Sequence, residues 1–592
     1  MATARIFGGE RVGVLFSVSR ETHLLAHGFG EPPLGPGLTM SQRVNVPDDR
    51  EATWQGALTL FAALEERASI SPDNLAIIGG HRQVTYSEWR DAAREKAGLL
   101  WGLGVRSRDR IAVLTDNRIE WLELAMASAL LGARFVPFST WVKAPELAYL
   151  LGHARPMVLF VGDAPEQDHL VRALTDCIPG LATPDGPWPD ARFPELRTVI
   201  ELGSDTPRGF PDVEEWAGTE RGAGVNVSSG PDPSEIAMVL YTSGSTAAPK
   251  AVGQRHRDLL INGFHIGERL GLTDKDHVFL AAPLFWSYGS ANALMAALTH
   301  GSALVLQPRF EAGQAISIIE EAACTVIYTL PAMTHALVEH SDFAIDRLLT
   351  LSRGVTIGPP AEVAFAASAL GVDGICNIYG STEVYGNCCV TPFAASLERR
   401  IRSQGPPLPG VELRIVSPDV RTPLGPMDEG EIEVRGRVSP GYVNDSGAPE
   451  PIVDGDGWFR TGDTGYLDAE GWLTFTGRAS EMIKTAGINV SPLEVEKCLR
   501  SHPDVEEAAV TGADHPIRGE QVVAFVRLRS GGDSTPQQLV QHCAQQLAVY
   551  KVPVLILVVS QFPVTGTGKL ARGDLKRLAT IALDDIALKA GT

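Results

Sequence analysis

Strand-like and helix-like segments alternate along most of the N-terminal two thirds of this sequence. A strand predicted over 110–114 is followed by a helix over 120–132 and a strand over 135–137. The same order returns with a strand over 303–307 and a helix over 313–323. Such alternation favours parallel strands joined by helical crossovers, so the predicted fold class is α/β with a largely parallel sheet.

The pattern changes from about residue 405. Short strands punctuated by proline and glycine are predicted over 411–416, 431–435 and 472–476, which indicates a β-rich subdomain at about 405–477. A last α+β unit follows from about residue 481. At the other end, residues 1–45 are rich in glycine and proline, and we expect a flexible extension there.

Size and charge narrow the function classes. A chain of 592 residues exceeds what one hydrophobic core normally supports, so several domains are expected. The net charge of −20 disfavours nucleic acid and anionic membrane surfaces as partners, and no apolar run is long enough to span a membrane. The seven scattered cysteines form no C-x-x-C pair, which is typical of buried apolar residues in a reducing cytoplasm.

A hydroxyl-rich loop over Thr242–Lys250 directly follows a fully apolar strand over Ile236–Tyr241. Backbone N–H groups and hydroxyls around a glycine can wrap a polyphosphate, although the Walker A spacing is absent. An ordinary polar turn is the alternative. The candidate phosphate ligands are Thr242, Ser243, Gly244, Ser245, Thr246 and Lys250.

A second cluster, Tyr379-Gly-Ser-Thr-Glu383, ends the apolar strand predicted over 374–379. Ligands of open α/β folds bind at this edge of the sheet. Because Mg²⁺ joins proteins through one or two carboxylates together with substrate phosphates, Glu383 is the metal candidate. The alternative is a pair of capping residues that open a helix.

Two further motifs lie towards the C-terminus. Asp463 can accept two hydrogen bonds from a ribose diol, and Arg478 can bind phosphate oxygens in a bidentate manner. Lys569, in the motif Pro563-Val-Thr-Gly-Thr-Gly-Lys569, is a long-stemmed point charge suited to a carboxylate and an α-phosphate. The alternatives are a β-turn aspartate and a solvated surface lysine.

In this order, the four motifs resemble those of the adenylate-forming superfamily, which includes acyl-CoA synthetases, adenylation domains of nonribosomal peptide synthetases and beetle luciferases. The resemblance covers roughly residues 55 to 575. It implies an N-terminal domain over 46–479, built from two αβ lobes and the β-subdomain, and a small mobile C-terminal domain over 480–592, with a hinge at Ser480.

The resemblance implies an acyl-CoA ligase that uses ATP, Mg²⁺ and coenzyme A. A carboxylate would attack the α-phosphorus of ATP, and a thiol would then attack the acyl-adenylate after the C-terminal domain rotates. In this scheme Lys569, Thr382, Glu383 and Arg478 are catalytic. The loop around Gly487 would guide the thiol.

The same resemblance implies positions for the rest of the substrates. Adenine would lie against Gly358, Pro359 and Tyr379, and the ribose on Asp463. The implied acyl-site residues are Phe285, Trp286, Gly289, Tyr328 and Gly380. A tryptophan at position 286, where many relatives have histidine, hints at a hydrophobic acid, although a core aromatic is the alternative.

The departures from the family pattern keep other functions open. Ala247 and Ala251 stand where many relatives have glycine, and a Cβ there can crowd the phosphates. One alternative is therefore an enzyme that mainly thioesterifies a supplied acyl-adenylate. Loading of a separate carrier protein is another, since little sequence follows Lys569 and no fused carrier domain is expected. A luciferase-like oxidase and an inactive regulatory protein are less favoured.

Overall fold

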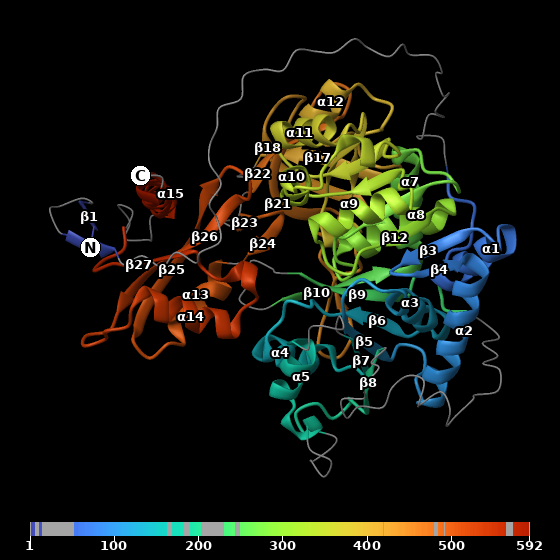
Figure 1. Ribbon diagram of the computed structural model, residues 1–592, viewed down its shortest axis with the longest axis horizontal. Helices are drawn as coiled ribbons and strands as arrows, with labels where there is room; N and C mark the ends of the chain where they lie inside the picture. The colour runs from blue at the N-terminus through green and yellow to red at the C-terminus, as the bar shows by residue number, and fades with distance from the viewer. Residues whose placement is uncertain are drawn as a thin grey trace.

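The computed structural model describes residues 53–162, 169–182, 190–202, 230–242, 249–417, 420–478, 483–490, 492–563 and 572–590, together with the short paired strands β1 (Ala2–Arg5) and β2 (Arg11–Val14). The α/β class predicted from the sequence is confirmed (Figure 1). Most of the chain forms two eight-stranded sheets with helices packed on them, followed by two smaller β-containing units.

The first sheet has the order β20-β19-β10-β9-β6-β5-β7-β8. Its strands are β5 (Arg110–Thr115), β6 (Arg134–Pro137), β7 (Val158–Gly162), β8 (Thr198–Glu201), β9 (Ile236–Thr242), β10 (Lys250–Arg255), β19 (Tyr442–Val443) and β20 (Pro449–Glu450). The strands from β9 to β8 are parallel, whereas β10, β19 and β20 add antiparallel pairs at one edge. The hydroxyl-rich loop therefore connects two adjacent antiparallel strands, β9 and β10.

The second sheet has the order β16-β15-β14-β13-β11-β12-β3-β4. Its strands are β3 (Leu75–Gly79), β4 (Arg82–Thr85), β11 (His277–Leu280), β12 (Ala303–Leu306), β13 (Val326–Tyr328), β14 (Arg353–Thr356), β15 (Gly374–Tyr379) and β16 (Cys389–Val390). Its central strands are parallel and both edge strands are antiparallel. The carboxyl ends of β13, β14 and β15 therefore meet at one edge, where Tyr328, Thr356 and Tyr379 lie.

The hydrophobic clusters explain the layering of the large domain. The largest cluster contains residues of both sheets and of the helices between them, α1 (Leu60–Ile70), α2 (Tyr86–Gly102), α3 (Ile119–Leu131), α7 (His256–Leu270) and α8 (Met295–His300). Helices α4 (Ala144–Ala154) and α5 (His169–Cys177) cover the outer face of the first sheet. Helices α9 (Ala312–Glu321), α10 (Pro331–Glu339) and α11 (Pro360–Leu370) cover the second. Two αβ lobes thus share one core.

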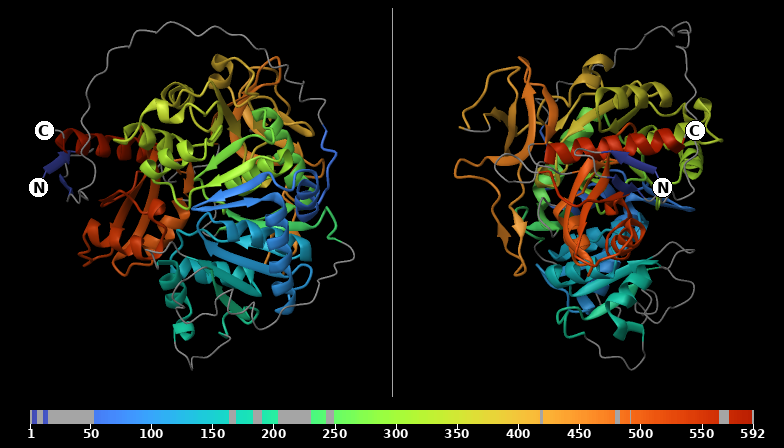
Figure 2. Two further views of the ribbon diagram at one scale, coloured as in Figure 1. Left: turned by 45° about the vertical axis from the view of Figure 1, so that its right-hand side comes forward. Right: turned by 90° about the vertical axis from the view of Figure 1, so that its left-hand side faces the viewer.

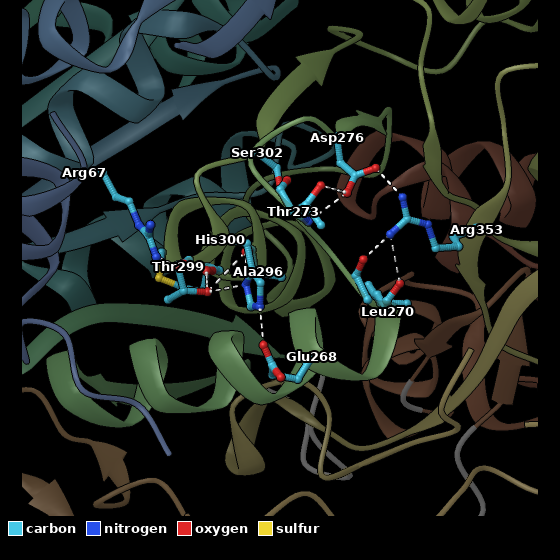
Figure 3. Close-up of polar contacts among 12 residues, drawn as sticks. Arg67, Glu268, Leu270, Thr273, Asp276, Ala296, Thr299, His300, Ser302 and Arg353 are labelled. Atoms are coloured by element: carbon cyan, nitrogen blue, oxygen red, sulfur yellow. Dashed lines mark hydrogen bonds and ion pairs between the residues drawn. The ribbon is translucent and has the colours of Figure 1, made fainter. Parts of the chain in front are cut away.

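Polar contacts tie the inner helices to the second sheet (Figure 3). Glu268 on α7 pairs with His300 at the end of α8, with 3.1 Å between Oε1 and Nε2. The carboxylate of Asp276 binds Arg353 at the start of β14 and accepts a 2.8 Å hydrogen bond from the backbone N–H of Thr273. Because buried charges need partners, these contacts help to hold α7 to α8 and β14 to the turn that precedes β11.

The β-rich subdomain expected from about residue 405 is an antiparallel four-stranded sheet. Its order is β17-β18-β21-β22, with strands β17 (Val411–Val416), β18 (Gly430–Gly436), β21 (Phe459–Leu467) and β22 (Leu473–Arg478). The strands predicted over 411–416, 431–435 and 472–476 match three of these within one or two residues. Strand β21, which carries Asp463, was not predicted from the sequence.

The C-terminal unit has hydrophobic clusters of its own and lies beside the large domain (Figures 1 and 2). It contains β23 (Ile483–Thr485), β24 (Ile488–Val490), α13 (Pro492–Arg500), β25 (Val505–His515), β26 (Gly519–Leu528), α14 (Pro536–Gln546), a short 3₁₀ helix η5 (Val549–Lys551), β27 (Leu555–Val558) and α15 (Arg572–Ala590). Helix α14 contacts α4 of the large domain. The expected hinge, Ser480, lies outside the described residues.

Two expectations about the whole chain can be compared with the structure. All seven cysteines lie in the described part, where they are buried and free of disulfides. Among the residues that the structure describes, no helix is both long and apolar enough to cross a bilayer.

Candidate functional site

The hydroxyl-rich loop is closed by a strand pair. Thr242, at the end of β9, pairs with Lys250, the first residue of β10. The ammonium of Lys250 lies 4.6 Å from the ring centre of Tyr442, and a hollow of ≈ 500 Å³ lined in part by Lys250 and Tyr442 opens beside it. Ser243, Gly244, Ser245, Thr246 and Ala247 lie outside the described residues. Ala251 packs into the core cluster of the first sheet.

Glu383 is linked through Tyr442 to Lys250, the last residue of this loop. It belongs to a 3₁₀ turn, η4 (Thr382–Val384), and Tyr442 Oη donates a 3.0 Å hydrogen bond to its Oε1. Burial and the nearby carboxylate of Glu383 raise the pKa of Tyr442, so its hydroxyl stays a donor. The backbone of the turn is held by Gln254, whose side-chain amide donates to the Thr382 carbonyl over 2.9 Å. Tyr442 thus bridges Glu383 and Lys250.

The residues around Glu383 fit a magnesium ion that enters with its substrate. A half-buried carboxylate, held by one hydrogen bond from Tyr442, is a hard oxygen donor that this tyrosine links to Lys250. Mg²⁺ binds in this way, through one or two carboxylates, waters and substrate phosphates. In the part of the chain that the structure describes, no group of three or more His, Cys, Asp or Glu side chains gathers as a metal site.

The nucleoside candidates Tyr379 and Asp463 contact each other. Tyr379 Oη donates a 2.9 Å hydrogen bond to Asp463 Oδ2, and both residues are buried, with 6% and 4% exposure. Burial, with a further contribution from the Asp463 charge, raises the pKa of Tyr379 well above its usual range. Asp463 also pairs in register with Arg478 on β22, whose side chain lies outside the described residues. The hydrogen bond between Tyr379 and Asp463 joins the second sheet to the β-rich subdomain.

Three of the five acyl-site candidates, Phe285, Trp286 and Gly289, lie in the segment that leads into α8. Phe285 and Trp286 lie 6.0 Å apart at ring centres, ahead of a π-helix, η2 (Tyr288–Leu294). Tyr328, at the end of β13, packs edge-on against Tyr288 at 5.3 Å. A Cβ on Gly289 would lie 2.4 Å from the Pro283 carbonyl oxygen, so only glycine fits there.

Gly380 has a similar structural explanation. A Cβ at this position would lie 2.2 Å from the carbonyl oxygen of Gly386 and 2.7 Å from Cα of Asn387. The close approach of two backbone segments requires a glycine here, independently of any substrate. A role for Gly380 in the acyl site therefore stays a prediction.

Three candidates lie in two connections between elements. Gly358 and Pro359 connect β14 to α11, with Pro359 as the residue that precedes the helix. Ala486 and Gly487 form the two-residue turn between β23 and β24, and both have positive φ, 50° and 80°. Such hairpin turns require left-handed conformations at both positions. The turn brings Gly487 to the large domain, because a Cβ there would lie 3.8 Å from Leu330 Cδ2.

The structure adds two aromatic residues that carried no sequence motif. The Trp141 ring lies 5.0 Å from that of Trp286 and 5.4 Å from that of Phe285, in both cases edge to face. Tyr550, from the C-terminal unit, packs on the other side of Trp141 at 5.2 Å. Lys569 lies outside the described residues.

Comparison with known proteins gives matches over most of the chain. The model of the AMP-binding enzyme family matches residues 64–443, and that of the AMP-binding enzyme C-terminal domain matches residues 494–569. The chain is 32% identical to a 2-succinylbenzoate–CoA ligase of Geobacillus kaustophilus over 519 residues, 87% of this chain and 97% of that one.

Two solved structures of o-succinylbenzoate CoA synthetase from Bacillus subtilis are also similar. A double mutant bound to its product analogue, OSB-NCoA, superposes with a TM-score of 0.72 at 27% identity, covering 87% of this chain and 97% of that one. The complex with AMP superposes with a TM-score of 0.58 at 27% identity, covering 87% and 98%.

Proposed function

Since this chain belongs to the family of AMP-binding enzymes, in the acyl-CoA synthetase branch of the adenylate-forming superfamily, we propose that it joins a hydrophobic carboxylic acid to coenzyme A through an acyl-adenylate. Its family and its named relatives show that the protein is an AMP-forming CoA ligase. The relatives do not favour an enzyme restricted to supplied adenylates. They do not identify the acid.

The reaction has two balanced steps. An oxygen of the acid attacks the α-phosphorus of ATP, and the bond to the bridging oxygen breaks so that pyrophosphate leaves. The thiol of coenzyme A then loses its proton to solvent and attacks the carbonyl carbon, and AMP leaves with the electrons of the C–O bond. Bound Mg²⁺ would neutralise the phosphate charge in the first step. Glu383 would hold it, while Tyr379 and Asp463 would bind the nucleoside.

The preference for a hydrophobic acid rests on the aromatic wall of the candidate acyl site. The rings of Phe285, Trp286 and Trp141 all pack on one another edge to face, and Tyr328 packs on Tyr288. None of the five acyl-site candidates carries a charge. A second carboxylate on the acid would lose its hydration there without a charged partner, which is costly.

The arrangement of the two domains is the one that we propose for thiol attack. At the same identity, the chain superposes better on the B. subtilis enzyme with a product analogue than on that enzyme with AMP, with TM-scores of 0.72 and 0.58. The turn at Gly487 faces Leu330 of the large domain, as a loop that guides a thiol would. For ATP activation, Lys569 must reach the site in another orientation.

A panel of acids tests the function and the acid class together. Octanoate, decanoate and phenylpropanoate are compared with suberate and 2-succinylbenzoate, each with ATP and coenzyme A, and AMP and thioester are quantified separately. We expect a monocarboxylate to exceed suberate, its dicarboxylate counterpart, by at least about tenfold in kcat/KM. Preference for a dicarboxylate would refute the hydrophobic class, and AMP release without thioester for any acid would refute coenzyme A as acceptor.

Tyr442→Phe is expected to raise the Mg²⁺ concentration needed for half-maximal adenylation roughly fivefold. The hydroxyl of Tyr442 holds the Glu383 carboxylate, and losing one such bond costs about 1 kcal/mol. The measurement is ATP–pyrophosphate exchange over a Mg²⁺ titration at saturating acid. Tyr466→Phe, on β21, is the control and should leave the titration unchanged. An unchanged midpoint in Tyr442→Phe would argue against Glu383 as the metal ligand.

A further inference from the structure

Lys551 is buried between the two domains, bound to a carboxylate from each. Its residue is 3% exposed, and Nζ lies 2.5 Å from Glu146 Oε1 and 2.7 Å from Glu494 Oε1. Glu146 is in the first turn of α4 in the large domain, whereas Glu494 is in the first turn of α13 in the C-terminal unit. We call these three residues the interdomain clasp.

The clasp is an electrostatic unit. Burial alone would lower the pKa of Lys551, but Tyr550 and the two carboxylates raise it overall, so the ammonium stays charged. Burial raises the pKa of Glu494, and the Glu146 charge adds to this effect while Lys551 opposes it. Lys551 keeps Glu494 as its partner if the contact with Glu146 is lost, so Glu146 adds a second charged contact to a pair that the C-terminal unit makes by itself.

The two carboxylates belong to different domains. Glu494 and Lys551 belong to the same unit, so their contact can persist when that unit rotates. Glu146 is 405 positions from Lys551 in the chain and on the other side of the domain boundary, so its contact exists only in the arrangement described. Of the three residues, Glu146 alone therefore distinguishes one domain orientation from another.

The clasp is continuous with the wall of the candidate acyl site. Tyr550, the neighbour of Lys551, packs on Trp141, and Trp141 packs on Trp286. The ring of Tyr550 is buried in this interface, and burial raises its pKa to about 12. Its phenol is therefore neutral there. The contact of Lys551 with Glu146 and the contact of Tyr550 with Trp141 therefore belong to the same domain arrangement.

We propose that Glu146 is a positioning residue: by binding Lys551 it holds the C-terminal domain in the orientation that transfers the acyl group to the thiol. The inference rests on the proposed two-step function. A contact made only in one of two states shifts the population towards that state. The clasp must open before Lys569 can approach ATP, so it favours the second step and not the first.

Glu146→Gln tests the clasp, because it keeps the shape of the side chain and removes its charge. We expect thioester formation from a supplied acyl-adenylate to slow roughly tenfold, which corresponds to about 1.4 kcal/mol. ATP–pyrophosphate exchange should stay unchanged or rise. The matched control is Glu65→Gln, which removes an exposed carboxylate that pairs with Arg94 within the large domain, and it should change neither half-reaction.

Four outcomes would overturn the proposal. Equal losses in both half-reactions would indicate a merely structural role for Glu146, and undiminished thioester formation would show that the clasp does not position the domain. If Glu146→Gln does not fold, Glu146→Asp, which keeps the charge and lengthens the contact, should show the same split at smaller size, and its absence would refute the clasp. A wild-type protein that performs neither half-reaction would refute the proposed function, and the clasp with it.

Discussion

Lys569→Ala is expected to slow formation of the acyl-adenylate by about 10²- to 10³-fold, while thioester formation from a supplied adenylate changes little. A charged donor that meets the developing negative charge between the carboxylate and the α-phosphate acts in the transition state of the first step only, and removal of one such donor commonly costs this much. The measurement is ATP–pyrophosphate exchange beside single-turnover thioester formation, both with the best acid of the panel.

The control for this prediction is another lysine of the C-terminal unit. Lys576 on α15 pairs with Glu520 and Asp514, and its ammonium is therefore engaged away from the candidate site. Lys576→Ala should leave both half-reactions within about twofold of the wild type. Equal losses in both half-reactions of Lys569→Ala would contradict the role assigned to Lys569, because a residue withdrawn by domain rotation cannot slow the second step directly.

Asp463→Ala is expected to lower kcat/KM for ATP by about 10²-fold. Asp463 is 4% exposed and is held by Tyr379, its proposed partner is the ribose diol, and a hydrogen bond to a charged group contributes about 1.5–3 kcal/mol. The variant also leaves the Tyr379 hydroxyl without its acceptor. Initial rates over an ATP titration give the effect, with thermal unfolding to separate loss of binding from loss of fold.

Two further variants test the Asp463 prediction, one with a smaller expected loss and one as a control. Tyr379→Phe removes only the hydroxyl that orients the carboxylate, so the loss should be smaller, roughly fivefold. Glu412→Ala removes an exposed carboxylate of the same subdomain that pairs with Arg435, and ATP kinetics should not change. A loss in Asp463→Ala no larger than that in Glu412→Ala would exclude a contact between Asp463 and the nucleotide.

Local pattern predicted several of the elements in this chain. The strand predicted over 110–114 is β5 (Arg110–Thr115), and the helix predicted over 120–132 is α3 (Ile119–Leu131). These predictions succeed because the side-chain period and the flanking glycines and prolines lie within the segment itself. Strand β21 was missed, because residues 459–467 include two glycines and an aspartate and show no apolar alternation.

The candidate site was predictable only in part. The motifs around Lys250, Glu383 and Asp463 are local, and their residue types indicate phosphate, metal and ribose chemistry by themselves. Their links are not local. Tyr442 joins Glu383 to Lys250, and it was absent from every motif, because its position depends on the pairing of β19 with β10.

The sequence by itself therefore determined the α/β order, the adenylate-forming motifs and the kinds of charge that a nucleotide site needs. Only the tertiary structure decided which of these groups meet. It placed Tyr379 on Asp463, explained Gly380 by a backbone 2.2 Å from where a Cβ would stand, and brought Glu146 to Lys551. The physical reason is range: periodicity and turn chemistry act over a few residues, whereas contacts between residues hundreds of positions apart depend on how sheets and domains pack.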